Sequence, residues 1–162
     1  MTVTCGRLFG PRFVKQGVQI LVVDDEVAVR RSIKMMLEHV GHTVFQADCG
    51  EAALEQLGRL KFDLVITDFS MPGMQGDQLV ARIRQMVPLQ AIIMATAFAE
   101  EFKVFGKPEG SVDALILKPF TFKELLEVIA DVLSRRAGGQ PEVGPPNAGQ
   151  TSSPAPPRAL PE

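Results

Sequence analysis

The chain has 162 residues, of which 46% are hydrophobic and 22% are charged, and this composition predicts a globular domain with a sizeable core. Its formal net charge of −2 argues against a nucleic-acid-binding domain, which would normally be basic. The longest apolar stretch, residues 91–99 with Thr96 inside it, is far shorter than the roughly 20 residues that span a bilayer, so we expect no membrane insertion. The two cysteines, Cys5 and Cys49, lack metal-ligand spacing, which favours a cytoplasmic protein with reduced thiols.

The first half of the chain alternates short apolar runs with stretches of helical periodicity. Residues 1–17 show neither pattern, and we predict a flexible leader there. The apolar run at 20–23 ends in the acids Asp24 and Asp25. The expected elements that follow are a helix over 29–40 closed by Gly41, a strand at 43–47, and a helix with apolar residues to Leu60 that Asp48 and Glu51 would begin as a capping box.

The second half continues the alternation. Leu64, Val65 and Ile66 form a strand pattern that stops at Asp68, and Pro72, Gly73 and Gly76 mark the loop behind it. The expected elements that follow are a helix stopped by Pro88, a strand at 91–95 that leads to Thr96, a short helix at 98–105, a strand at 112–117 that leads to Lys118, and a last helix to Arg136 with Thr121 and Glu124 as its capping box.

The composition changes sharply at residue 137. Seven of the 12 prolines lie in residues 137–162, mixed with Gly, Ser and Ala, so we predict a disordered tail and no second folded domain after it. The ordered part, residues 18–136, alternates five expected strands with five expected helices. This alternation predicts an α/β fold with a parallel sheet and right-handed crossovers.

The residues that could bind a ligand or take part in a reaction lie at the ends of the expected strands. Ligands of open parallel sheets bind beyond the carboxyl ends of the strands, where Asp24, Asp25 and Asp68 would meet Thr96 and Lys118. Converging carboxylates repel one another, and an all-oxygen cluster suits Mg²⁺. The hydroxyl and the ammonium could bind phosphoryl oxygens, and a carboxylate can itself accept a phosphoryl group. Taken singly, Asp68 could instead cap a turn, Thr96 could be a plain strand-end hydroxyl, and Lys118 could be a surface charge.

The order of these motifs resembles the receiver domain of bacterial response regulators, over roughly residues 19–136. The resemblance is carried by Asp24-Asp25, by Asp68 with Met71-Pro72 and Gly76, by Thr96-Ala97, and by Lys118-Pro119-Phe120. It implies a flavodoxin-like, doubly wound sheet of five strands in the order 2-1-3-4-5, with helices on both faces.

The resemblance also implies roles for the matching residues. Asp68 would be the phosphoacceptor, and Mg²⁺ would be held by Asp24, Asp25, Asp68 and the backbone carbonyl of Ser70. Thr96 would hydrogen-bond the phosphoryl group, and Lys118 would pair with it. The peptide bond between Lys118 and Pro119 is typically cis in this family. The phosphoryl group would come from a histidine kinase or a phosphotransfer protein, and the phosphorylated surface would bind a downstream protein.

Two positions depart from the family pattern or bear on its chemistry. The aromatic residue that the family often has three positions before the lysine is Leu115 here, so the aromatic half of the usual switch is missing. Phe98 lies where some relatives carry a polar residue that assists water attack, which predicts slow self-dephosphorylation. We therefore expect a phosphoacceptor and not an enzyme with turnover.

Two alternatives use the same residues differently. A Mg²⁺-dependent phosphohydrolase with an aspartyl phosphate generally needs a second acid two positions after the nucleophile, where this chain has Ser70. A receiver-like scaffold that works without phosphorylation would have no need of the acids, Thr96 and Lys118. The chain could also be one module of a larger hybrid kinase, with the Pro-rich tail as a linker.

Overall fold

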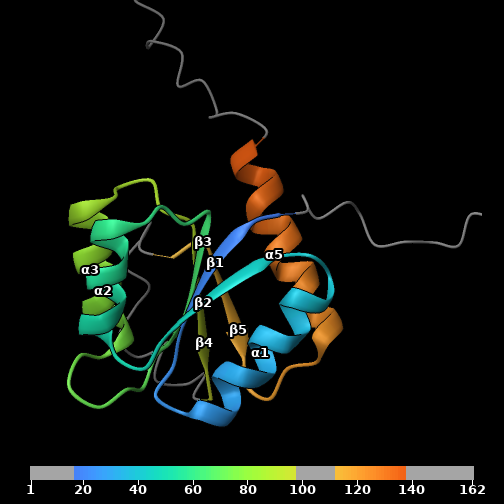
Figure 1. The fold of residues 1–162 in the computed structure, drawn as a ribbon, viewed down its shortest axis with the longest axis horizontal. Helices are drawn as coiled ribbons and strands as arrows, with labels where there is room; N and C mark the ends of the chain where they lie inside the picture. Colours follow the sequence, from blue (N-terminus) through green and yellow to red (C-terminus); the bar gives the residue numbers. More distant parts are fainter. Residues whose placement is uncertain (1–16, 98–111, 138–162) are drawn as a thin grey trace, which may run out of the picture.

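The computed structural model describes residues 17–97 and 112–137, which fold around one parallel sheet. The five strands run in the order β2-β1-β3-β4-β5, as expected for a flavodoxin-like fold. Figure 1 shows this sheet between two pairs of helices. The elements, in chain order, are β1 (Gln19–Val23), α1 (Val27–His39), β2 (Thr43–Ala47), α2 (Gly50–Arg59), β3 (Leu64–Asp68), α3 (Gly76–Met86), β4 (Ile92–Thr96), β5 (Ala114–Leu117) and α5 (Phe122–Ala137).

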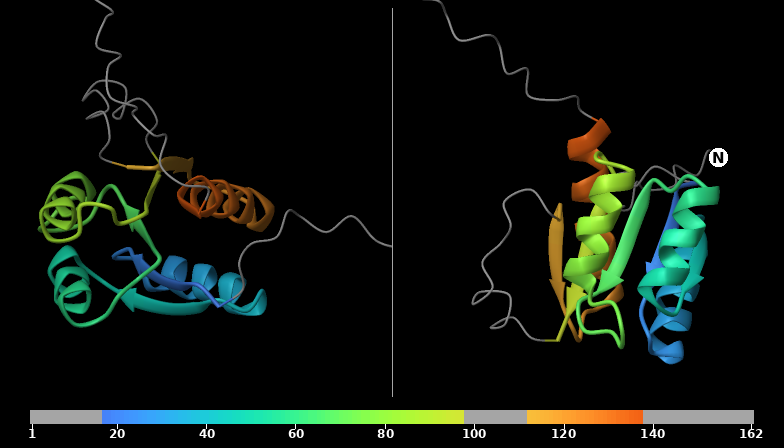
Figure 2. Two further views of the ribbon diagram at one scale, coloured as in Figure 1. Left: turned by 90° about the horizontal axis from the view of Figure 1, so that it is seen from above. Right: turned by 90° about the vertical axis from the view of Figure 1, so that its left-hand side faces the viewer.

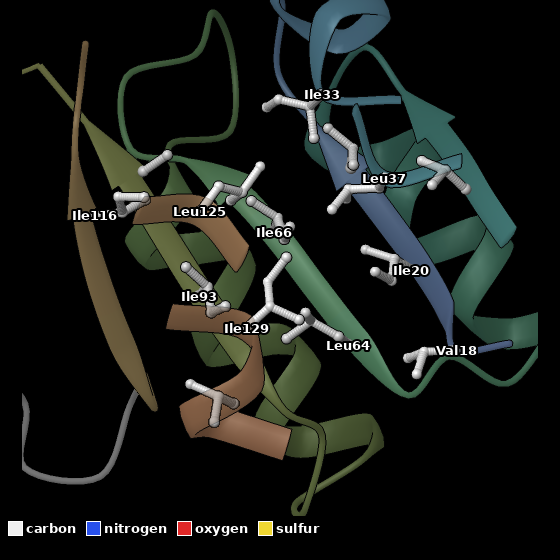
Figure 3. Close-up of a cluster of buried hydrophobic side chains, with 14 of the residues drawn as sticks. Val18, Ile20, Ile33, Leu37, Leu64, Ile66, Ile93, Ile116, Leu125 and Ile129 are labelled. Carbon is white, nitrogen blue, oxygen red and sulfur yellow. The ribbon is translucent and has the colours of Figure 1, made fainter. Parts of the chain in front are cut away.

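The two faces of the sheet carry separate hydrophobic clusters because successive strand residues point to opposite faces. In β1, Ile20 and Val22 pack with α1 and α5, whereas Leu21 and Val23 pack with α2 and α3. Figure 2 shows the helix pairs on opposite sides of the sheet, and Figure 3 shows the cluster on the α1–α5 side. The central strand β3 is buried along its whole length, as a strand covered on both faces must be.

The register of the sheet brings the carboxyl ends of four strands to one edge. Val23, the last residue of β1, pairs with Thr67, and Asp68 pairs with Ala95. Thr96 in turn pairs with Leu117, the last residue of β5. The arrowheads in the right-hand view of Figure 2 point to this common edge, where the functional residues are expected.

Helix ends confirm some of the expected local signals and correct one. Gly41 has a φ of +89° directly after α1 and its C-cap Val40, a conformation that favours glycine. The predicted capping box of the last helix is present: the Thr121 amide donates to Glu124 Oε2 at 2.7 Å, and the Glu124 amide donates to Thr121 Oγ1 at 3.2 Å. The box predicted from Asp48 and Glu51 is wrong, because α2 begins with Cys49 as N-cap and no side chain caps it.

The opposite end of the sheet is tied together by Asp113, the residue before β5. Its Oδ2 accepts from the Ile92 amide at 2.8 Å and pairs with Arg84 of α3 at 3.3 Å, while its Oδ1 pairs with Arg136 of α5 at 2.6 Å. One half-buried carboxylate thus joins α3, β4 and α5.

The helix predicted over residues 98–105, with Phe98, lies outside the described residues. Within the described part of the chain, no helix is both long and apolar enough to cross a bilayer.

Candidate functional site

Three acids and a lysine meet at the carboxyl edge of the sheet. Asp24 and Asp25 follow β1, Asp68 ends β3, and Lys118 follows β5. One carboxylate oxygen from each of the three acids lies within 4.8 Å of the other two. Asp24 is 2% exposed and Asp68 8%, whereas Asp25 is exposed to solvent. The acids therefore form a site that is buried on one side and open at Asp25.

The Lys118 ammonium lies between the two buried acids. Its Nζ is 2.6 Å from Asp24 Oδ2 and 3.2 Å from Asp68 Oδ2. The other oxygen of each acid accepts a backbone hydrogen bond at 2.8 Å, from the Glu26 amide to Asp24 and from the Phe69 amide to Asp68. Both carboxylates are thus held at two points, with Lys118 closer to Asp24.

Burial and charge act in opposite directions on this group. Burial raises the pKa of Asp68 and the Asp24 charge raises it further, while Lys118 offsets only part of the rise. Burial lowers the pKa of Lys118, but its hydrogen bonds and attraction to Asp24 and Asp68 outweigh burial and raise it overall. Lys118 is therefore held as an ammonium, and a further cation beside Asp68 would favour the ionised form of that carboxyl.

The oxygen donors fit a divalent cation. Carboxylate oxygens from Asp24, Asp25 and Asp68 are close enough together to bind one ion, and nitrogen or sulfur ligands are absent from this described cluster. Because Asp25 is exposed, water could complete the coordination shell of Mg²⁺, which keeps several waters in proteins. The set as a whole suits Mg²⁺ better than a softer metal.

The remaining predicted residues lie around this group. Thr96 is 1% exposed at the end of β4, and its carbonyl accepts the Lys118 amide at 2.8 Å, which fixes Lys118 to the sheet. The Lys118–Pro119 bond is cis, as the resemblance implied. Ser70 is exposed two residues after Asp68, and Leu115 is half-buried in β5 against the cluster on the α2–α3 side.

Two residues of the site have structural contacts that the sequence analysis did not anticipate. Arg30, in the first turns of α1, donates from Nη1 to the carbonyl of Asp24 at 2.5 Å. Gly76, the first residue of α3, donates its amide to the Phe69 carbonyl at 2.8 Å and lies directly against the Asp68 backbone. A basic residue in a helix that has no acid in its first turn was the available signal for Arg30.

Comparison with known proteins identifies the family. The family model for the response regulator receiver domain matches residues 20–130. Chemotaxis protein CheY-3 of Vibrio cholerae is 35% identical over 125 residues, which cover 75% of this chain and 96% of that protein. Chemotaxis protein CheY of Pseudomonas aeruginosa is 36% identical over 75% of this chain and 100% of its own length. The chain spans only 27% of the response regulator protein FleR of Pseudomonas aeruginosa, to which it is 37% identical over 128 residues.

Solved structures agree with the sequence relatives. A receiver domain protein of Methanospirillum hungatei superposes with a TM-score of 0.70 at 31% identity, covering 76% of this chain and 98% of that one. The response regulator TrrA of Thermotoga maritima, solved in complex with Mg²⁺ and BeF, gives a TM-score of 0.66 at 33% identity, covering 71% of this chain and 98% of that one. The family model and these relatives together show that the chain belongs to the response regulator receiver domain family.

Proposed function

We propose that the chain is a phosphorylation-dependent signalling module that accepts a phosphoryl group on Asp68. The carrying observation is the buried Asp68 carboxylate at the end of β3, which lies close to the carboxylates of Asp24 and Asp25 and has its Oδ2 3.2 Å from Lys118 Nζ. Receiver domains generally act as phosphoacceptors in two-component signalling and not as enzymes with turnover. The donor would be a histidine kinase or a phosphotransfer protein, and we also propose a cytoplasmic location.

We assign Mg²⁺ to Asp24, Asp25, Asp68 and the carbonyl of Ser70, a set supported by the spacing of the three carboxylates. TrrA, a relative with 33% identity, was solved with Mg²⁺ and BeF bound. A bound Mg²⁺ would supply positive charge that neutralises the acids and the phosphoryl oxygens. The chain itself must supply the nucleophile, its orientation and the second cation.

In the proposed step, an Asp68 oxygen attacks phosphorus and forms a P–O bond, while the P–N bond of the phosphohistidine donor breaks and its electron pair goes to the imidazole nitrogen. Lys118, held as an ammonium by Asp24 and Asp68, would pair with the added phosphoryl charge. Thr96 would donate its hydroxyl to a phosphoryl oxygen from the end of β4. The new charge would then change the surface near β4 and β5 that a partner protein binds, with Leu115 in place of the usual aromatic residue.

The experiment is the mass of the intact protein after incubation with a small phosphodonor. Acetyl phosphate and phosphoramidate, which has a P–N bond, are each tested with Mg²⁺ and with EDTA. We expect wild type to gain one phosphoryl group only with Mg²⁺, Asp68→Ala to gain none, and Asp77→Asn, which changes an exposed acid in the first turn of α3, to behave as wild type. A folded wild type that both donors leave unmodified would contradict the proposal and favour a phosphorylation-independent scaffold. Sustained phosphate release from small substrates would favour the phosphohydrolase.

A further inference from the structure

We propose that Arg30 is a positioning residue that holds Asp25 in place for the metal ion, an inference that rests on the proposed function. Asp25 is exposed, and among the described residues its carboxylate takes part in no hydrogen bond or ion pair. Its two fellow acids are each held at both carboxylate oxygens. The position of Asp25 must therefore come from its backbone.

The backbone of Asp25 is fixed through the peptide bond that joins it to Asp24. The Asp24 amide donates to the Ala47 carbonyl at 3.3 Å, which extends the pairing of β1 and β2 by one residue. The Asp24 carbonyl, one residue beyond β1, accepts a hydrogen bond from the guanidinium of Arg30. Because a peptide unit is planar, holding this oxygen also fixes the direction in which the Asp25 Cα continues. Arg30 thus acts on both acids through one carbonyl.

The placement of Arg30 has a cost that this contact offsets. Positive charge near a helix N-terminus opposes the helix dipole, and α1 has no acid in its first turn. The Arg30 amide bonds to the Glu26 carbonyl at 3.1 Å, so the residue lies in the first turns of the helix and its side chain folds back toward the N-terminus. Arg30 is half-buried along a cavity of about 440 Å³ between α1 and the segment from β2 to α2.

The neighbouring arginine provides a matched control. Arg31 carries the same charge on the same helix and lines the same cavity, but it is exposed and makes no hydrogen bond to Asp24. Arg30→Gln and Arg31→Gln therefore change the net charge equally, and only the first removes the bond to the Asp24 carbonyl. The comparison separates positioning from the general electrostatic attraction of the site for a cation.

The test is Mg²⁺ binding by the full chain, measured by isothermal titration calorimetry, with the Asp25 amide followed by NMR. Residues that orient metal ligands typically contribute about 10–100-fold to metal affinity, so we expect Arg30→Gln to weaken Mg²⁺ binding by at least about tenfold and to shift the Asp25 amide resonance. Arg31→Gln should bind within about twofold of wild type, because it removes only a screened charge. Arg30→Lys, which keeps the charge but lacks the planar fork, should be intermediate.

A double mutant with Asp25→Asn identifies the acid through which Arg30 acts. We expect Arg30→Gln to weaken Mg²⁺ binding much less when Asp25 is already neutral, and full additivity would overturn the inference. Equal effects of Arg30→Gln and Arg31→Gln would also overturn it. If Arg30→Gln does not fold, Arg30→Lys against Arg31→Lys decides in the same way. A folded wild type that binds no Mg²⁺ would contradict the metal site of the proposed function, and the inference with it.

Discussion

Gly76 is the position where the smallest addition to the chain should disturb the site most. A Cβ atom there would lie 2.3 Å from the Asp68 carbonyl oxygen and 2.9 Å from the Phe69 Cα. An ordinary carbon–oxygen contact is about 3.3 Å, so the start of α3 and the backbone of Asp68 must separate by about 1 Å. Both contacts are to backbone, and a rotamer change cannot relieve them.

We therefore expect Gly76→Ala to lower the free energy of unfolding by about 1–3 kcal/mol, the usual cost of overpacking. A displacement of about 1 Å at a reacting group reduces rates on the order of 100-fold, so phosphorylation of Asp68 should slow by a similar factor. Stability is measured by urea unfolding followed by circular dichroism, since the chain contains no Trp or Tyr. The phosphorylation rate is measured by intact-protein mass.

Gly58 offers the opposite outcome for the same chemical change. It lies in α2, is exposed, and a Cβ there would meet nothing within 4 Å. Gly58→Ala should therefore stabilise the protein by about 0.5–1 kcal/mol through helix propensity and leave phosphorylation unchanged. If Gly76→Ala matches wild type in both stability and phosphorylation rate, the close approach of α3 to Asp68 is not what positions the acid.

Three further predictions test the electrostatics and the capping. The pKa of Asp68 in the folded protein is raised above 3.8, so its ionised form destabilises the fold at higher pH. Asp68→Asn should therefore melt at a higher temperature than wild type at pH 7 without Mg²⁺, and this gain should shrink toward about pH 4. A lower melting temperature of the variant at pH 7 would refute this. Burial lowers the pKa of His42 below 6.5, so the free energy of unfolding should decline as the pH falls below 6.5. His42→Leu should flatten that decline, whereas His39→Leu, at an exposed position, should not. Thr121→Ala removes the hydroxyl that pairs with Glu124 and should lower the melting temperature by a few degrees, and an unchanged melting temperature would show that the capping box contributes nothing.

The features that sequence reasoning predicted correctly are those that depend on local pattern and on the rules of parallel sheets. The apolar runs before Asp24, Asp68 and Lys118 identify the strands β1, β3 and β5, and parallel strands deliver their carboxyl ends to one edge. The order of the strands and the approach of the three acids follow from these two facts once the family is identified. The Thr121–Glu124 box was predictable because both partners are three residues apart.

The features that escaped prediction depend on contacts distant in sequence or on atomic fit. The contact between Gly76 and the Asp68 carbonyl depends on how α3 packs on the loop behind β3, and a glycine in a loop pattern indicates only a turn. The Arg30 bond depends on the path of the backbone after β1. Asp48 and Glu51 match a capping pattern by spacing, but α2 begins at Gly50 with Cys49 as its N-cap, and spacing alone does not fix where the first turn starts.

The residues of the site lie far apart in the sequence, and this separation has a consequence for the newly synthesised protein. Lys118 and Asp24 are 94 residues apart, and β3 and β4 lie between the strands β5 and β1 that precede them. A chain still emerging from the ribosome presents Asp24 long before Lys118, whose ammonium pairs with it. The site is therefore complete only when β5 has docked, and on the proposed function the ability to accept a phosphoryl group would report that the sheet has formed. On the proposed function, a damaged or half-folded copy would not be phosphorylated on Asp68 and would send no signal.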